Sequence, residues 1–191
     1  MEKSVPVLPC PHETERLILR PFTPADVDAV HAYHSLEAVA RYQMWAPRTR
    51  DQVAVEIGKW ISRSLAEEAM SWAVTLRQTR TLIGDVTLMH RDREARQAEI
   101  GFSFNPEFGG QGYGREAAAS LLELGFSELK LHRIFGRCDA RNRPSWRLLE
   151  GIGMRREAHF REHAIFKGDW DEEFYYAMLA SEWAEKSRGA K

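Results

Sequence analysis

The chain has 191 residues, 43% of them apolar and 29% charged, which suits one domain with a real core and excludes a disordered chain. It carries 27 basic and 28 acidic side chains, and this formal net charge of −1 argues against a nucleic-acid binder, whose surface would be distinctly basic. No apolar run reaches the ~18 residues of a membrane span, no secretory signal opens the chain, and two cysteines (Cys10 and Cys138) make no disulfide framework, so we expect a cytoplasmic protein.

The N-terminal part predicts one strand and two helices after a flexible tail at residues 1–13, which holds three prolines. The stretch RLILRPF at 16–22 alternates in the manner of a strand. Thr23 can cap a helix that has Pro24 in its first turn, and Thr49–Gln52 forms the capping-box pattern of a second helix. The second helix has an apolar face at helical spacing: Val53, Ile57, Trp60, Ile61 and Leu65.

The middle of the chain predicts an antiparallel meander of three strands, at 71–77, 81–90 and 97–105, because only short polar turns separate them. A glycine-rich stretch follows and leads into an amphipathic helix. The apolar face of that helix comprises Ala117, Leu121, Leu122, Phe126 and Leu129.

The C-terminal part predicts a strand at 133–139 and a short helix after Pro144, which ends at Gly151 and Gly153. Two further strands and a terminal helix complete the chain; they lie at 155–166, 172–179 and 181–186, and the turn at 167–169 joins the two strands. The element order β-α-α-β-β-β-α-β-α-β-β predicts a mixed α/β fold over residues 14–191, with a mainly antiparallel central sheet flanked by helices.

The glycine-rich stretch is the strongest local signal for chemistry. It reads Gly109, Gly110, Gln111, Gly112, Tyr113, Gly114 and Arg115. Glycine allows a tight turn and a close approach of the backbone to a ligand, and the free amides at a helix start favour an anion such as a pyrophosphate. The spacing fits neither the dinucleotide fingerprint nor the P-loop, and a plain connecting turn is the alternative.

The stretches EIGFSFNPEFGGQGYGREAA and HRIFGRCDARNRPSWRLLEGIGM resemble the acyl-CoA-binding core of the GNAT superfamily of N-acetyltransferases. The similarity is strongest to the branch that acetylates N-termini of ribosomal proteins (RimJ/RimL-like), and it extends over residues 13–183. The resemblance implies the GNAT fold, acetyl-CoA as acyl donor, a primary amine as acceptor and no metal ion. Homodimers are common in this branch, so the resemblance also implies a homodimer.

The same resemblance implies roles for individual residues. The amides of 110–115 would wrap the pyrophosphate of acetyl-CoA, with Gly109 at a position where relatives often have Arg or Gln. Phe102 and Phe104 would bond the pantetheine arm through their backbone, where their strand separates from the strand that begins at residue 133. Asn142 would contact the same arm. At a position where the branch often has Thr, Arg115 is expected to contact a phosphate directly.

Two residues are candidates for proton transfer. Ser145 would protonate the leaving thiolate, because Leu149 occupies the position where relatives place a tyrosine; helix capping is the alternative for Ser145. Glu99 is the first candidate for the base that takes a proton from the amine, and a solvent-facing or arginine-paired carboxylate is the alternative. A chain α-amine, with a pKa of about 8, needs only a weak base, whereas a lysine amine with a pKa of about 10.4 needs a stronger one.

Tyr42 and Trp45 precede the second helix and are expected to line the acceptor site. His159 and His163 share a strand and either border the cleft or lie on the surface. Five arginines near turns predict a solvated rim: Arg77, Arg80, Arg91, Arg93 and Arg96.

His31 and His34 are three residues apart on a helix, and because no third ligand is evident we expect a solvated face rather than a zinc site. Cys138 is expected to be a buried structural thiol.

The sequence therefore predicts an acetyl-CoA-dependent N-acetyltransferase whose acceptor is a primary amine such as a protein N-terminus. Three alternatives remain open: another donor such as succinyl-CoA, a small-molecule amine such as a polyamine or aminoglycoside, and a regulatory module that binds acyl-CoA without catalysis.

Overall fold

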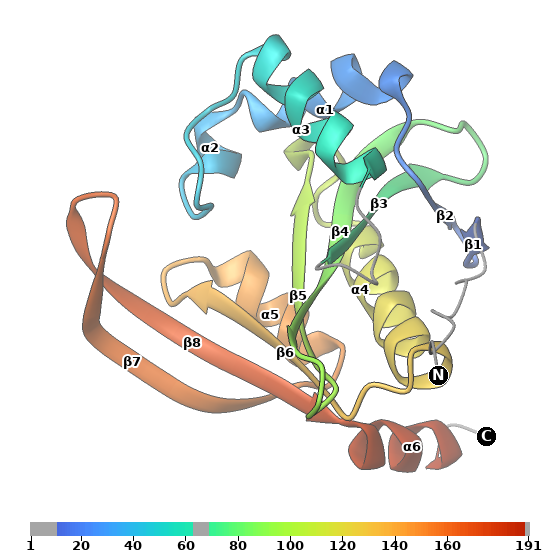
Figure 1. The fold of residues 1–191 in the computed structure, drawn as a ribbon, viewed down its shortest axis with the longest axis vertical. Coiled ribbons are helices and arrows are strands. Elements are labelled where there is room, and N and C mark those ends of the chain that lie inside the picture. The colour runs from blue at the N-terminus through green and yellow to red at the C-terminus, as the bar shows by residue number, and fades with distance from the viewer. Residues whose placement is uncertain (1–10, 63–68, 190–191) are drawn as a thin grey trace.

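A computed structural model describes residues 11–62 and 69–189 of the chain. One eight-stranded sheet with the order β1-β2-β3-β4-β5-β6-β8-β7 organises the molecule (Figure 1). The strands are β1 (His12–Glu13), β2 (Leu17–Arg20), β3 (Ala69–Leu76), β4 (Leu82–Asp92), β5 (Gln97–Phe104), β6 (Arg133–Asp139), β7 (Arg155–Phe166) and β8 (Asp169–Leu179). The helices are α1 (Val27–His34), α2 (Glu37–Ala40), α3 (Arg50–Ser62), α4 (Tyr113–Glu123), α5 (Arg143–Gly151) and α6 (Ala180–Gly189).

Alternating side chains of the sheet pack against different helices. On β3, Trp72 and Val74 are buried in the larger apolar cluster, to which α4 contributes Ala117 and Leu121. Ala73 between them is buried in the second cluster, with Val30 of α1 and Val53 and Ile57 of α3. Since successive side chains of a strand point to opposite faces, α4 and the α1/α3 pair cover opposite sides of this part of the sheet. The mixed α/β fold predicted from the element order is confirmed.

The junction of β5 and β6 creates the opening that the site needs. All other neighbouring strands are antiparallel, whereas β5 and β6 are parallel and pair only from Gln97–Glu99 to Arg133–Phe135. Both strands continue beyond this point, to Phe104 and to Asp139. Their facing backbone edges are therefore free to hydrogen bond a ligand inserted between them.

The structure differs from the sequence prediction in two short elements, in where ordered structure begins and in the exposure of Ile61. The strand β1 and the helix α2 are too short to show a periodic pattern, and neither was expected. The pairing of β1 with β2 means that ordered structure begins before the predicted end of the tail at residue 13. Ile61 is exposed although it has helical spacing with Val53 and Ile57. Leu65 and Cys10 lie outside the described residues, as do residues 1–9 of the predicted tail.

No helix in the described part of the chain combines the length and apolar character needed to cross a membrane.

Candidate active site

A cavity of about 450 Å³ lies where β5 and β6 separate. The segment between α2 and α3 borders it on one side, and the long hairpin of β7 and β8 borders it on the other (Figure 1). Four of the predicted site residues line it together: Glu99, Phe102, Asn142 and Ser145. Tyr42 and Trp45 line it as well, as predicted.

Glu99 lies on the cavity floor between two arginines. Its side chain is almost fully buried, and its oxygens accept hydrogen bonds from Arg91 Nε at 2.8 Å and Arg137 Nε at 3.1 Å. Burial opposes the charge of Arg137, but the charge of Glu99 and its hydrogen bond outweigh that effect and raise the pKa of Arg137. Glu99 is thus arginine-paired, which was the alternative given for it, and its role as a base stays a prediction. Arg91 lines the cavity, and its side chain is exposed, as expected of a solvated rim.

Ser145 lies in the first turn of α5, but it is not the residue that caps the helix. The cap is Asn142, whose Oδ1 accepts a hydrogen bond from the Ser145 amide at 3.4 Å. The Ser145 hydroxyl is therefore available to the cavity and to the neighbouring thiol of Cys138. Burial raises the pKa of that thiol to about 12, against a smaller opposing effect of a hydrogen bond with Ser145. The predicted burial of Cys138 is confirmed, and Cys138 also lines the cavity, so its structural role stays a prediction.

The glycine-rich stretch runs into the N-terminus of α4. Gly110 and Gly112 have φ values of 74° and 79°, which are left-handed conformations that favour glycine. The first intrahelical hydrogen bond comes from the Glu116 amide to the Gly112 carbonyl at 3.0 Å. The amides of 113–115 are therefore the free donors of the first helical turn, and this is the arrangement that binds a phosphate.

Arg16 holds this loop in place, and sequence reasoning missed its role. Its guanidinium donates to the Gln111 carbonyl at 3.0 Å and to the Glu116 carboxylate at 2.6 Å, and it lies over the Tyr113 ring. Thr14 also donates to Glu116, at 2.6 Å. No local pattern could indicate these contacts, because about a hundred residues separate their partners.

The remaining predicted residues surround the same loop. Phe104 packs its ring at the space that a Cβ on Gly114 would fill, so the start of α4 lies directly against β5. The Arg115 side chain lies against Gly151 at the end of α5, and its contact with a phosphate stays a prediction. A free strand edge, a close-packed glycine and the free amides of the first helical turn are all present, and Phe102 and Asn142 line the cavity; their contacts with acetyl-CoA stay predictions.

One prediction for the histidines is wrong. His34 does not lie on a solvated face: its side chain is 2% exposed, with Nε2 at 3.2 Å from Asp85 and Nδ1 at 3.3 Å from Arg48. Its ring stacks on Trp45 and so supports the aromatic wall of the cavity. His163 lines the cavity, which is one of the two positions expected for it.

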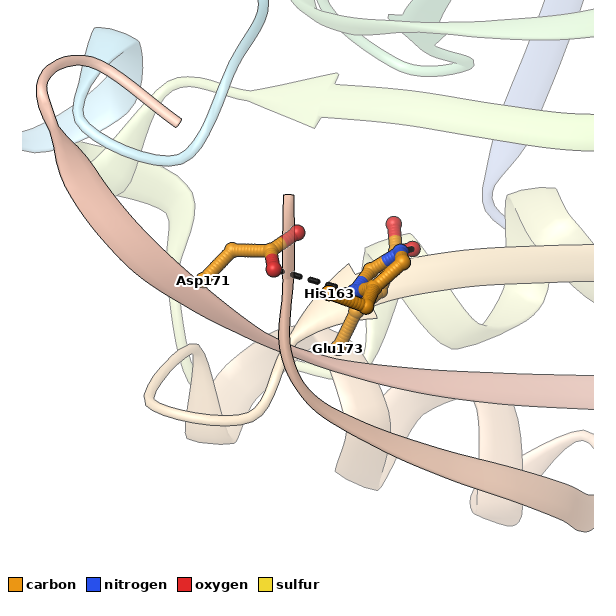
Figure 2. A group of neighbouring side chains, drawn as sticks. All are labelled: His163, Asp171 and Glu173. Atoms are coloured by element: carbon orange, nitrogen blue, oxygen red, sulfur yellow. Dashed lines mark ion pairs between the residues drawn. The ribbon is translucent and has the colours of Figure 1, made fainter. Parts of the chain in front are cut away.

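His163 lies in a cluster with two carboxylates that the sequence analysis did not single out. Figure 2 shows Asp171 directed toward the His163 ring, with Glu173 beside the ring. The distances are 2.9 Å from Nδ1 to Asp171 and 3.6 Å from Nε2 to Glu173. All three residues line the cavity.

Lys167 fastens the tip of the β7–β8 hairpin over the cavity. Its Nζ donates to the carbonyl of Ala40 at 2.7 Å and to that of Trp45 at 3.0 Å. The hairpin tip is thereby joined to the segment that carries Trp45 of the aromatic wall.

Replacement of Lys167 by alanine should raise the KM for the acceptor several-fold and leave the KM for acetyl-CoA unchanged. Two hydrogen bonds from a charged donor in a partly exposed position stabilise the closed hairpin by about 1–2 kcal/mol. Initial rates measured with each substrate varied in turn test this, with Lys59→Ala as control because Lys59 pairs with Glu56 on α3 away from the cavity. An equal rise in both KM values would contradict a role at the acceptor end.

Comparison with known proteins gives a consistent result. Residues 16–155 match the family described as acetyltransferase (GNAT) domain. An uncharacterized N-acetyltransferase of Bacillus subtilis, YnaD, is 36% identical over 170 residues, 89% of this chain and 97% of the relative. YdaF of the same species, a putative ribosomal N-acetyltransferase, is 32% identical over 103 residues, 54% of this chain and 56% of the relative. A GNAT-family acetyltransferase from Bacillus anthracis superposes with a TM-score of 0.81 and 35% identity, covering 89% of this chain and 98% of that one.

Proposed function

The chain belongs to the GNAT family of acetyltransferases, and from this premise we propose that it acetylates a small primary amine that carries a second positive charge. The observation that carries this proposal is the charge of the cavity, which is lined by five carboxylates and two guanidinium groups. Both guanidinium groups hydrogen bond Glu99, and Asp139 has its own partner in Arg141. The other three carboxylates are consecutive residues of β8, Asp171 to Glu173, whose partners include the imidazoles of His159 and His163 and, at 3.8 Å, Arg137. Carboxylates therefore outnumber guanidinium groups in the lining.

The opposite wall supports the same class of acceptor. Tyr42 and Trp45 face the cavity from the segment between α2 and α3. An ammonium group between aromatic rings and carboxylates is stabilised by both. The cation–π contact with the rings alone contributes about 0.5–2 kcal/mol. A second ammonium on the acceptor would therefore be held while the first one reacts.

Acetyl-CoA supplies the thioester carbonyl that the amine attacks. In this proposal the amides of 110–115 hold its pyrophosphate, and the free edge of β5 at Phe102 and Phe104 aligns its arm. Asn142 contacts the arm near the start of α5, and Ser145 donates a proton to the leaving sulfur. Holding both reactants in a fixed groove lowers the barrier through orientation, before any proton transfer is considered.

A second candidate acceptor is the α-amine of a protein N-terminus, as the sequence predicts. The 32% identity with a putative ribosomal N-acetyltransferase favours it, although the match covers 54% of this chain. An α-amine would carry one positive charge, whereas the carboxylates of β8 are suited to more than one.

A matched pair of acceptors separates the two candidates. We expect 1,4-diaminobutane to have a KM at least tenfold below that of 1-aminobutane, with release of CoA followed by a thiol reagent, and we expect this difference to shrink at high salt. A higher kcat/KM for peptides with free N-termini would establish the second candidate instead. Replacing acetyl-CoA by succinyl-CoA tests the donor, and binding of acetyl-CoA without thiol release in any assay would indicate a regulatory module.

A further inference from the structure

We propose that Glu173, in contact with His163 and through it with Asp171, accepts the proton that the acceptor amine loses. The proposal concerns the same cavity and rests on the amine acceptor of the proposed function. Sequence reasoning favoured Glu99 for this step, and the two carboxylates differ in their surroundings in a way that separates their roles.

The three residues come together through the pairing of β7 with β8. Asp171 and Glu173 are two residues apart on β8 and so share one face of the sheet. On β7 the register shifts between Arg161 and Ile165, where Glu162 has a φ of 50°, and this bulge holds His163. Bulges re-aim side chains next to active sites, and here the His163 ring lies within reach of both carboxylates (Figure 2).

Glu173 is freer than Glu99 to take up a proton. Both oxygens of Glu99 are hydrogen bonded to guanidinium groups, so a proton on Glu99 would remove the counter-charge that Arg91 and Arg137 share. The contact of Glu173 with Arg137 is longer, 3.8 Å. Its side chain is 17% exposed, so it faces the cavity yet is largely removed from bulk water.

Charged groups surround Glu173 on every side. Arg137 and Asp139 lie on β6, His163 on β7, Asp171 on β8 itself and Glu99 on β5. Burial raises the pKa of Glu173, Arg137 and His163 oppose this, and Asp171 and Glu99 add to it, so that the pKa lies above its ordinary value. A carboxylate with a raised pKa is a better proton acceptor near neutral pH than an ordinary surface glutamate.

The step balances as follows. Glu173 takes a proton from the ammonium group, which frees the nitrogen lone pair. The lone pair forms the N–C bond to the thioester carbonyl carbon, and the C–S bond breaks with its electron pair on sulfur. Ser145 gives its hydroxyl proton to the thiolate and takes up the second proton from the nitrogen. The Glu173 proton leaves through His163, whose side chain is 37% exposed and opens to solvent.

The test compares Glu173→Gln with wild type on two acceptors of different basicity. With 1,4-diaminobutane, which is almost fully protonated at pH 7, kcat should fall at least tenfold and recover as the pH rises. With 2,2,2-trifluoroethylamine, which is already neutral at pH 7, kcat should change less than about threefold, because no base is needed. Glu185→Gln, an exposed change on α6 outside the cavity, is the matched control and should behave as wild type.

Two results would overturn the assignment. One is an equal fall in the kcat of Glu173→Gln on both acceptors, which a purely structural role of Glu173 would cause. The other is that Glu99→Gln, and not Glu173→Gln, shows the loss that depends on pH and on the acceptor, which would return the base to Glu99.

A measurement without any acceptor keeps this inference separate from the proposed function. In an infrared titration of the free enzyme, the difference between wild type and Glu173→Gln should contain a carboxyl band that disappears at a higher pH than the bands of exposed glutamates. A band that titrates with the exposed glutamates would contradict the assignment even if every amine is acetylated. Absence of thiol release from the wild type with all amines would instead contradict the proposed function.

Discussion

Replacement of Ser145 by alanine is expected to lower kcat about a hundredfold and to leave the free energy of unfolding almost unchanged. The loss is typical of removing a general acid or base, which contributes a factor of about 10²–10⁴. The small effect on stability follows from the cap of α5, because Asn142 and not Ser145 fulfils that role. Stopped-flow or steady-state thiol release gives kcat, and thermal unfolding gives the stability.

Asn142→Ala, in contrast, is expected to lower the free energy of unfolding. Loss of the cap of a helix costs about 1 kcal/mol, within a range of about 0.5–2 kcal/mol. A comparison of the two variants thus separates the catalytic from the structural contribution at the start of α5. Full turnover by Ser145→Ala would show that water or another group protonates the leaving sulfur, and a loss of stability equal to that of Asn142→Ala would assign Ser145 to capping.

The regular elements could be predicted because periodicity is local. The bounds predicted for β6 and β7 agree with the structure, and β8 begins three residues earlier than expected, at Asp169. The apolar face predicted for α4 is buried at Ala117, Leu121 and Leu122. In contrast, β1 with 2 residues and α2 with 4 residues are too short for a periodic pattern. They form because β1 pairs with β2 and α2 packs beside α1.

The parts of the site that escaped prediction depend on contacts between distant residues. His34 could not be recognised as buried, because its partner Asp85 lies 51 positions away. For His163 a signal did exist. The predicted turn at 167–169 makes the two predicted strands antiparallel neighbours. This pairing alone places residue 163 near residues 171–173, and so the imidazole near the carboxylates. The bulge that fixes its direction left no such signal.

The glycine-rich loop is the feature on which acetyl-CoA binding depends most directly. Gly110→Ala is expected to raise the KM for acetyl-CoA by about tenfold to a hundredfold. The Cβ of alanine would meet nothing within 4 Å, so the fold can accommodate the side chain. The left-handed backbone at φ 74° would be strained by about 1–2 kcal/mol, and relaxation of this strain turns the neighbouring amides away from the phosphates. Each charge-assisted hydrogen bond lost in this way costs about 1.5–3 kcal/mol, which corresponds to about one to two orders of magnitude in affinity.

Gly168→Ala is the matched control for this prediction. Gly168 has a φ of 95° and equally open space at its Cβ, but it lies in the turn between β7 and β8, far from the loop along the chain. Both variants should therefore lose a similar amount of stability, while the KM for acetyl-CoA should rise for Gly110→Ala alone. Isothermal titration with CoA, combined with thermal unfolding of both variants, measures the two effects separately. An equal loss of CoA affinity in the two variants would mean that general strain, and not the position of the loop amides, explains the change.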